Sequence, residues 1–193
     1  MSNIEFEIHE VQNFSKKEQD KFLSAVSELK DVLNSEEFHS RFLALPLEQT
    51  KGQTPRSILG MIKSGADKFN TLEDGDIDIY ITMYYSFGRA IGYTYPSTWK
   101  TWINRKFFSR FDLASIAGNI FHEYMHNLGF GHKTPSDHNS VPYAAGHLVR
   151  LMIREKLEFG KYLTLDESNK IKKKVKSRLS FWGRAKNFIK RIF

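Results

Sequence analysis

Alternating polar and apolar residues predict strands in two well-separated parts of the chain. Residues 3–14 begin with Ile4, Phe6 and Ile8 alternating with polar residues, and residues 76–85 alternate in the same way as DIDIYITMYY. A period of two is typical of a strand that buries one face. Shorter strands are expected within residues 86–98 and in the segment WKTWINRKFF that follows.

Apolar residues spaced three and four apart predict helices before, between and after these strands. The best-marked helix begins after Ser15, which with Glu18 three residues later forms a capping-box pattern. A second strong start is Asp112, an N-cap residue type, and Gly129 is expected to end that helix. The other expected helices span residues 35–45, 55–69 and 141–159. Strands and helices together predict the α+β class.

Length and composition limit the organisation and the chemistry. The 193 residues are enough for one domain, which we place at residues 1–163, with a tail at residues 164–193. There is no cysteine, so a metal site must use His, Asp or Glu. The N-terminal residues have no basic stretch followed by an apolar run, and no segment is apolar enough to span a membrane. We therefore expect a cytoplasmic location, with peripheral membrane attachment as an extension of it.

The segment HEYMHNLGFGH carries the clearest chemistry in the chain. His122 and His126 are four residues apart, so a helix places both imidazoles on one face. Gly129 allows a sharp turn after the helix, and His132 can then return toward the other two. Three histidines leave one position open at a tetrahedral zinc ion, which is the arrangement of a catalytic site. Glu123 is placed to act as a general base on a water bound there.

The pattern H-E-x-x-H-x-x-G-x-x-H resembles the zinc-binding signature of the metzincin metallopeptidases. This resemblance implies a Zn²⁺ cofactor held by His122, His126 and His132, and a small mixed β-sheet flanked by helices. It also implies a zinc-dependent endopeptidase in which Glu123 activates the zinc-bound water that attacks a peptide bond. The substrate would be a peptide or protein, paired with the strand that precedes the active-site helix.

One feature of that family differs in this chain. In metzincins a turn with a methionine lies beneath the zinc, whereas the corresponding segment here is Ser140-Val141-Pro142-Tyr143. Tyr143 is a candidate catalytic residue, because its hydroxyl could donate a hydrogen bond to the oxyanion formed from the attacked carbonyl. The alternative is that Tyr143 only packs at the start of a helix.

Other residues near the motif compete for roles in the site. His138 is a rival third ligand, and Asp137 could orient a ligand imidazole. His147 is expected to be a helix residue, with a supporting contact to the metal ligands as the alternative. Aromatic residues that could line a substrate cleft, or simply pack in the core, are Tyr93, Tyr95, Trp99 and Trp102.

The tail suggests a second activity. Residues 170–193 hold ten Lys or Arg and no acid, while the rest of the chain carries 19 basic and 22 acidic residues. Apolar and aromatic residues recur there at helical spacing, which is typical of a basic amphipathic helix at an anionic membrane surface. Nucleic acid fits less well, because the aromatic residues share the apolar face. The alternative function is therefore a membrane-associating protein whose zinc site is structural or vestigial.

Overall fold

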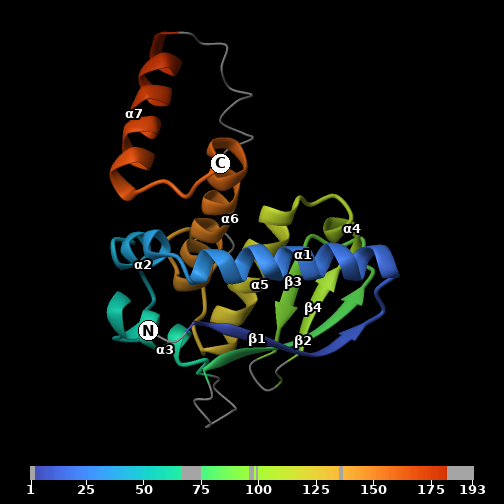
Figure 1. The fold of residues 1–193 in the computed structure, drawn as a ribbon. Helices are drawn as coiled ribbons and strands as arrows, with labels where there is room; N and C mark the ends of the chain where they lie inside the picture. Colours follow the sequence, from blue (N-terminus) through green and yellow to red (C-terminus); the bar gives the residue numbers. More distant parts are fainter. Residues whose placement is uncertain (1–2, 67–74, 96–97, 99, 135–136, 182–193) are drawn as a thin grey trace.

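The structure is a computed structural model that describes residues 3–66, 75–95, 98, 100–134 and 137–181. A small mixed sheet of four strands is accompanied by helices, so the expected α+β class is confirmed (Figure 1). In chain order the elements are β1 (Glu5–Gln12), α1 (Lys16–Leu33), α2 (Glu36–Leu43), α3 (Pro55–Lys63), β2 (Asp76–Tyr84), β3 (Gly92–Thr94), β4 (Lys100–Asn104), α4 (Arg105–Phe108), α5 (Leu113–Asn127), α6 (Val141–Phe159) and α7 (Leu165–Phe181).

The sheet has the strand order β1-β2-β4-β3. Strands β1, β2 and β4 are parallel, and β3 runs antiparallel to β4 at the edge, with Tyr93 opposite Trp102. The strands predicted within residues 3–14 and 76–85 are confirmed as β1 and β2. The segment WKTWINRKFF is only partly a strand. It turns into α4 at Asn104, whose side chain accepts a hydrogen bond from the Lys106 N–H and so caps the new helix.

Helices α1 and α5 lie beside the sheet and close the hydrophobic core (Figure 1). The predicted capping box of α1 is present, since the Ser15 N–H donates to the Glu18 carboxylate and the Ser15 hydroxyl accepts from the Glu18 N–H. Every second residue of β2 enters the core, where the side chains of Ile77, Ile79, Ile81 and Met83 are buried. The alternation of residues in the sequence thus corresponds to the two faces of the sheet, with the apolar positions on the core face.

Helices α5 and α6 approach each other through two glycines. A Cβ atom on Gly118 would lie 2.5 Å from the Gly146 carbonyl oxygen, and the reverse substitution would meet the Gly118 oxygen at the same distance. The two backbones are therefore in direct contact, with no room for a side chain. A Cβ on Gly146 would also lie 3.1 Å from the His122 Cβ, so this crossing brings the start of α6 next to the candidate ligands.

The predicted helix at residues 141–159 is confirmed with those bounds as α6. The helix predicted at residues 55–69 is shorter, because α3 stops at Lys63 and Gly65 adopts a positive φ of 63°. Its last three predicted residues lie outside the described part of the chain.

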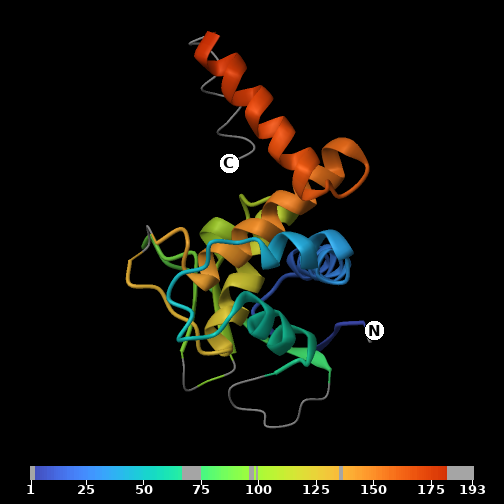
Figure 2. The same cartoon turned by 90° about the vertical axis from the view of Figure 1, so that its left-hand side faces the viewer.

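The tail predicted from residue 164 begins as helix α7, which extends away from the rest of the chain in both views (Figures 1 and 2). Its first turn is attached to the body, since the Ser168 hydroxyl donates to Glu155, which also pairs with Arg41. The apolar stripe expected further along lies mostly outside the described side chains, so its amphipathic character stays a prediction. Among the described residues, no helix has the length and apolar character needed to cross a membrane.

Gly146→Ala should lower the free energy of unfolding by about 1–3 kcal/mol, because the new methyl group meets backbone that cannot move aside cheaply. Gly60→Ala is the matched control. Gly60 lies exposed in α3 with open space at its Cβ position, so this change should stabilise the chain by about 0.5–1 kcal/mol. Chemical denaturation of both variants gives the comparison. Equal stabilisation by the two substitutions would contradict the close crossing of α5 and α6.

Candidate metal centre

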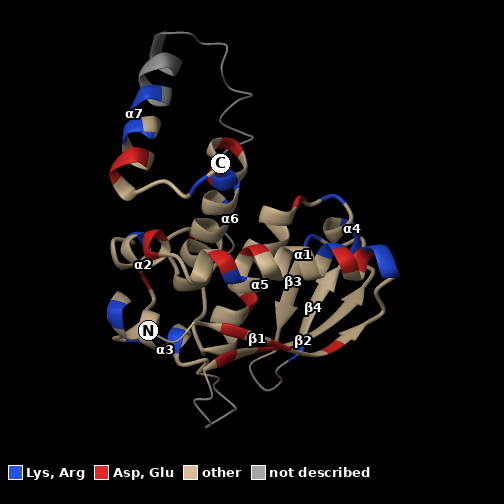
Figure 3. Cartoon of the chain, viewed as in Figure 1, with Lys and Arg blue, Asp and Glu red and all other residues tan. Residues whose placement is uncertain are grey.

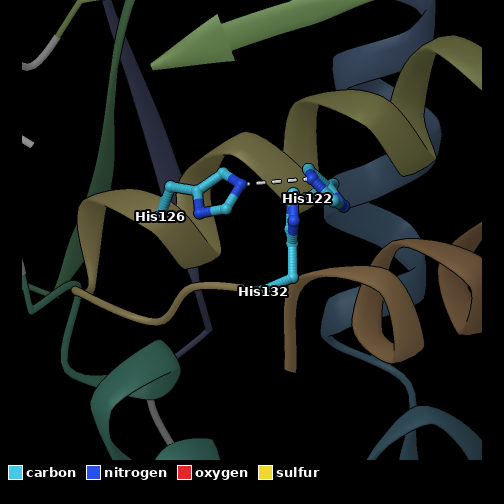
Figure 4. Close-up of side chains that lie close together, drawn as sticks. All are labelled: His122, His126 and His132. Carbon is cyan, nitrogen blue, oxygen red and sulfur yellow. Dashed lines mark hydrogen bonds between the residues drawn. The ribbon is translucent and has the colours of Figure 1, made fainter. Parts of the chain in front are cut away.

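Helix α5 presents the first two histidines. It begins at Asp112, whose side chain accepts a hydrogen bond from the Ser115 N–H at 2.7 Å, as the N-cap prediction requires. His122 and His126 then project from the same face one turn apart. Their Nε2 atoms lie 3.2 Å from each other (Figure 4).

The third histidine returns by way of the turn at Gly129. Gly129 has a φ of 91°, which a residue with a side chain rarely adopts. The Gly129 N–H donates to the His126 carbonyl oxygen and the Phe130 N–H to that of Met125, which ends α5 and reverses the chain. His132 then approaches the other two rings from the loop (Figure 4). One ring nitrogen from each of the three histidines falls within 4.8 Å of the others.

Backbone carbonyl groups hold two of these rings. The His126 Nδ1 lies 2.8 Å from the Phe130 carbonyl oxygen. The His122 side chain bonds the backbone of Pro142, which as a proline offers only its carbonyl. Because His122 Nε2 faces His126, the nitrogen bonded to Pro142 is Nδ1. A ring held at Nδ1 by a carbonyl group can direct its Nε2 lone pair at a metal ion.

This donor set fits a zinc ion. Zn–N bonds of about 2.0–2.1 Å at a tetrahedral angle separate two ligand nitrogens by about 3.3 Å. The observed 3.2 Å between the two Nε2 atoms agrees with that value. The two Nε2 atoms are hydrogen-bonded to each other here (Figure 4), and a bound metal ion would take the place of that bond. Burial and the neighbouring imidazoles lower the pKa of His122 to about 3, and burial also lowers that of His126, so both rings are in the neutral form that a metal requires.

Glu123 lies beside the histidines and is almost completely buried, with 3% of its surface exposed. The Thr94 side chain on β3 hydrogen-bonds its carboxyl group, and the Oε2 atom has no hydrogen-bond partner among the described residues. Burial raises the pKa of Glu123 to about 7, although the bond from Thr94 opposes that rise. A carboxyl group with a pKa near neutrality can both accept and release a proton at neutral pH.

The edge strand β3 closes over this carboxylate at Gly92. A Cβ on Gly92 would lie 3.3 Å from Glu123 Oε1 and 3.2 Å from Asn119 Oδ1. It would also lie 2.9 Å from the Trp102 carbonyl oxygen. The strand therefore depends on a glycine where it passes α5, and the Asn119 Oδ1 atom, like Glu123 Oε2, is buried there without a hydrogen-bond partner in the described residues.

Tyr143, at the start of α6, forms another wall of the site. Its ring centroid lies 4.6 Å from that of His122 and 4.6 Å from that of His132. The segment compared above with the methionine turn thus contacts the histidines through the Pro142 carbonyl and the Tyr143 ring. Burial and the nearby Glu123 raise the pKa of Tyr143, so its hydroxyl keeps a proton to donate.

The rival residues lie elsewhere. His138 is exposed and does not join the histidine group, although its ring is 6.4 Å from that of Tyr143. The Asp137 carboxylate accepts hydrogen bonds from the Lys133 and Thr134 N–H groups and from Gln49. It therefore orders the loop that follows His132. His147 is exposed on α6, as expected of an ordinary helix residue.

The aromatic residues proposed for a cleft are arranged differently. Thr94 reaches Glu123 on the α5 side of the sheet, so the preceding residue, Tyr93, points to the opposite face. There the rings of Tyr93 and Trp102 stack 5.3 Å apart, and Tyr95 contacts both. Tyr93 and Trp102 thus form an aromatic cluster on the far face instead of lining the histidine site. Trp99 lies outside the described residues.

Several site residues were not identified from the sequence. Asn119 precedes Glu123 by one helical turn, and that spacing alone could have marked it. The partners Thr94 and Gly92 come from a strand some thirty residues earlier, and the Pro142 and Phe130 groups are main-chain carbonyls. Contacts of these kinds cannot be predicted from a pattern in the sequence.

Comparison with known proteins gives no relative for this chain. No protein-family model, no curated protein and no solved structure matches it. The site must therefore be interpreted from its own geometry.

Proposed function

We propose that this chain is a zinc-dependent metalloendopeptidase of the metzincin type. The observation that carries the proposal is the convergence of His122, His126 and His132 at ligand distance beside a buried carboxylate. A structural zinc site is closed by four protein ligands, whereas three histidines leave a position open. The Glu123 Oε2 atom, which has no hydrogen-bond partner in the described part of the chain, supports a catalytic role further, since a purely structural site has no use for a buried base.

The sheet supports the same proposal. The family resemblance implies a small mixed sheet flanked by helices with a cleft at its edge strand, and the edge strand here is β3, which lies against α5. Strand β3 pairs with β4 along one of its edges, and a substrate peptide in extended form would pair along the other. The scissile bond would then lie beside Glu123.

In this mechanism the protein residues move the protons. A zinc ion held by the three histidines would supply Lewis-acid polarisation of the substrate carbonyl and acidify the attacking water. Glu123 takes a proton from that water as it adds to the carbonyl carbon, and delivers the proton to the leaving amine when the C–N bond breaks. The Tyr143 hydroxyl donates a hydrogen bond to the oxygen on which negative charge develops.

His132→Ala should lower zinc affinity by more than about a hundredfold, because loss of a direct ligand costs more than loss of a group that only orients one. His138→Ala is the matched control, being an exposed histidine six residues further along that should leave the affinity unchanged. Competition with a chelator of known affinity measures both. If His138→Ala lost zinc and His132→Ala retained it, the ligand assignment would be wrong.

Glu123→Gln should keep one zinc per chain and lose about 10²–10⁴-fold in the rate of peptide hydrolysis, since the amide cannot accept the proton. Cleavage of a diverse peptide library, followed by mass spectrometry, supplies the assay. Zinc bound by the parent chain without any Glu123-dependent cleavage of an amide would reject the peptidase. It would favour instead the membrane-associating protein with a structural zinc site.

Tyr143→Phe should lower kcat by about 10²-fold with little change in zinc content, because the ring packing survives and only the donor to the oxyanion is lost. Tyr95→Phe is the control, since Tyr95 is 55% exposed and packs in the aromatic cluster on the far face of the sheet. An unchanged kcat in Tyr143→Phe would assign Tyr143 a packing role only.

A further inference from the structure

The segment that runs from β2 to the turn after α4 is rich in basic and aromatic residues. Residues 79–111 contain five Lys or Arg and no Asp or Glu, together with eleven aromatic residues. The segment includes most of β2, all of β3 and β4, and α4 with the turn that follows it. Lys and Arg are visible around α4 (Figure 3). The Lys and Arg side chains of this segment take no part in the proposed zinc chemistry.

The loop between β2 and β3 holds two aromatic side chains out in solvent. Phe87 is 83% exposed and Tyr85 is 61% exposed, and their rings contact each other edge to face at 5.3 Å. Adjoining exposed rings make a contiguous apolar patch, and such patches can mark an interaction site. We call this exposed pair of rings the aromatic tip.

Buried contacts fix the base of this loop. Asn104 is fully buried, and its amide group donates to the carbonyl oxygens of Ser86 and Ala90 and accepts from the Ser86 N–H. Lys106 donates to the Phe87 carbonyl oxygen at 3.1 Å. The loop is thus held in one conformation at both ends, so the exposure of Tyr85 and Phe87 is part of the fold.

Cations without a carboxylate partner among the described residues lie on this loop and on the α4 region that contacts it. Two of the five in the segment are neutralised, since Lys100 pairs with Glu10 and Arg105 with Glu18. Within the described residues, Arg89, Lys106 and Arg110 form no ion pair. Arg89 follows Phe87 by two residues, and Arg110 lies one helical turn beyond Lys106.

We propose that the aromatic tip and its three cations form a docking surface for an anionic lipid bilayer. Aromatic side chains favour the interfacial region of a membrane, and Lys or Arg beside them are attracted to anionic headgroups. The Phe87 side chain has no polar group that could form a hydrogen bond with a specific partner. An edge-to-face pair also presents a wedge, whereas nucleic acid bases stack on flat, open ring faces. The chemistry therefore favours lipid over a single-stranded nucleic acid.

This surface is separate from the basic tail and has a consequence for the candidate site. The loop leads directly into β3, where Gly92 lies against Glu123 and Asn119. Insertion of the aromatic tip would therefore hold the edge strand, and the histidine centre beneath it, close to the membrane surface.

The chain has no cysteine, which allows a residue-specific test in the full-length protein. Phe87→Cys is labelled with an environment-sensitive fluorophore and mixed with vesicles of phosphatidylcholine and phosphatidylglycerol. Its emission should shift to the blue as the label enters the bilayer. Leu157→Cys, at a 68% exposed position on α6, is the matched control and should not shift. The control position is distant from the proposed surface. Lys156, next to Leu157, pairs with Glu28 and Asp31 toward the C-terminal end of α1, whereas Arg105 pairs with Glu18 near its N-terminal end.

Unlabelled variants give an independent measurement. Tyr85→Ser combined with Phe87→Ser should reduce vesicle partitioning by at least about tenfold, because at least one ring that would be buried in the bilayer is lost. Leu157→Ser should leave vesicle partitioning unchanged. Both variants should unfold at the parent temperature because the side chains are exposed. Vesicle binding with no shift at position 87, or unchanged partitioning of the double variant, would assign binding to the tail and overturn the proposal. So would absence of vesicle binding, or binding of a fluorescent oligonucleotide through the same residues.

Discussion

The direct contact between the backbones of α5 and α6 controls the geometry of the candidate metal centre. At Gly118 and Gly146 neither helix has room for a Cβ atom. Because the helices meet there, the first turn of α6 lies next to His122. The Pro142 carbonyl can then bind that imidazole, and the Tyr143 ring can cover two histidines. A wider crossing would leave His122 and His126 on the helix but remove the groups that orient His122.

A similar close approach operates on the other side of α5. Gly92 lets the edge strand pass over Glu123, and the carboxylate is buried as a result. That burial is costly, because Oε2 has no partner in the described residues and desolvation raises the pKa to about 7. Strained or unsatisfied groups of this kind are expected where a site must act on a substrate. The two glycine contacts thus bring a buried carboxyl group close to the half-buried histidines.

Much of this arrangement could be read from the sequence, for reasons that are local. Strand β2, the capping box of α1 and the bounds of α6 depend on neighbours within a few residues. The three histidines are likewise linked by one helix and one glycine turn. Contacts that cross the fold could not be predicted. Thr94 reaches Glu123 from a separate strand, and the face to which Tyr93 points depends on the position of β3 in the sheet. A single-residue register change would have exchanged those two side chains.

A buried ion pair helps to determine where the tail leaves the rest of the chain. Arg41 and Glu155 pair away from solvent, and the Arg41 guanidinium also donates to the Leu163 carbonyl while Ser168 donates to Glu155. A buried pair like this adds little net stability, because desolvating two charges offsets their attraction. Breaking it would nonetheless be costly, since one charge would be left buried alone. Its effect is therefore to specify where α7 starts, just where the chain leaves the body. The first turn of α7 is therefore fixed to the core, so a surface that bound the described start of this helix would also orient the histidine centre.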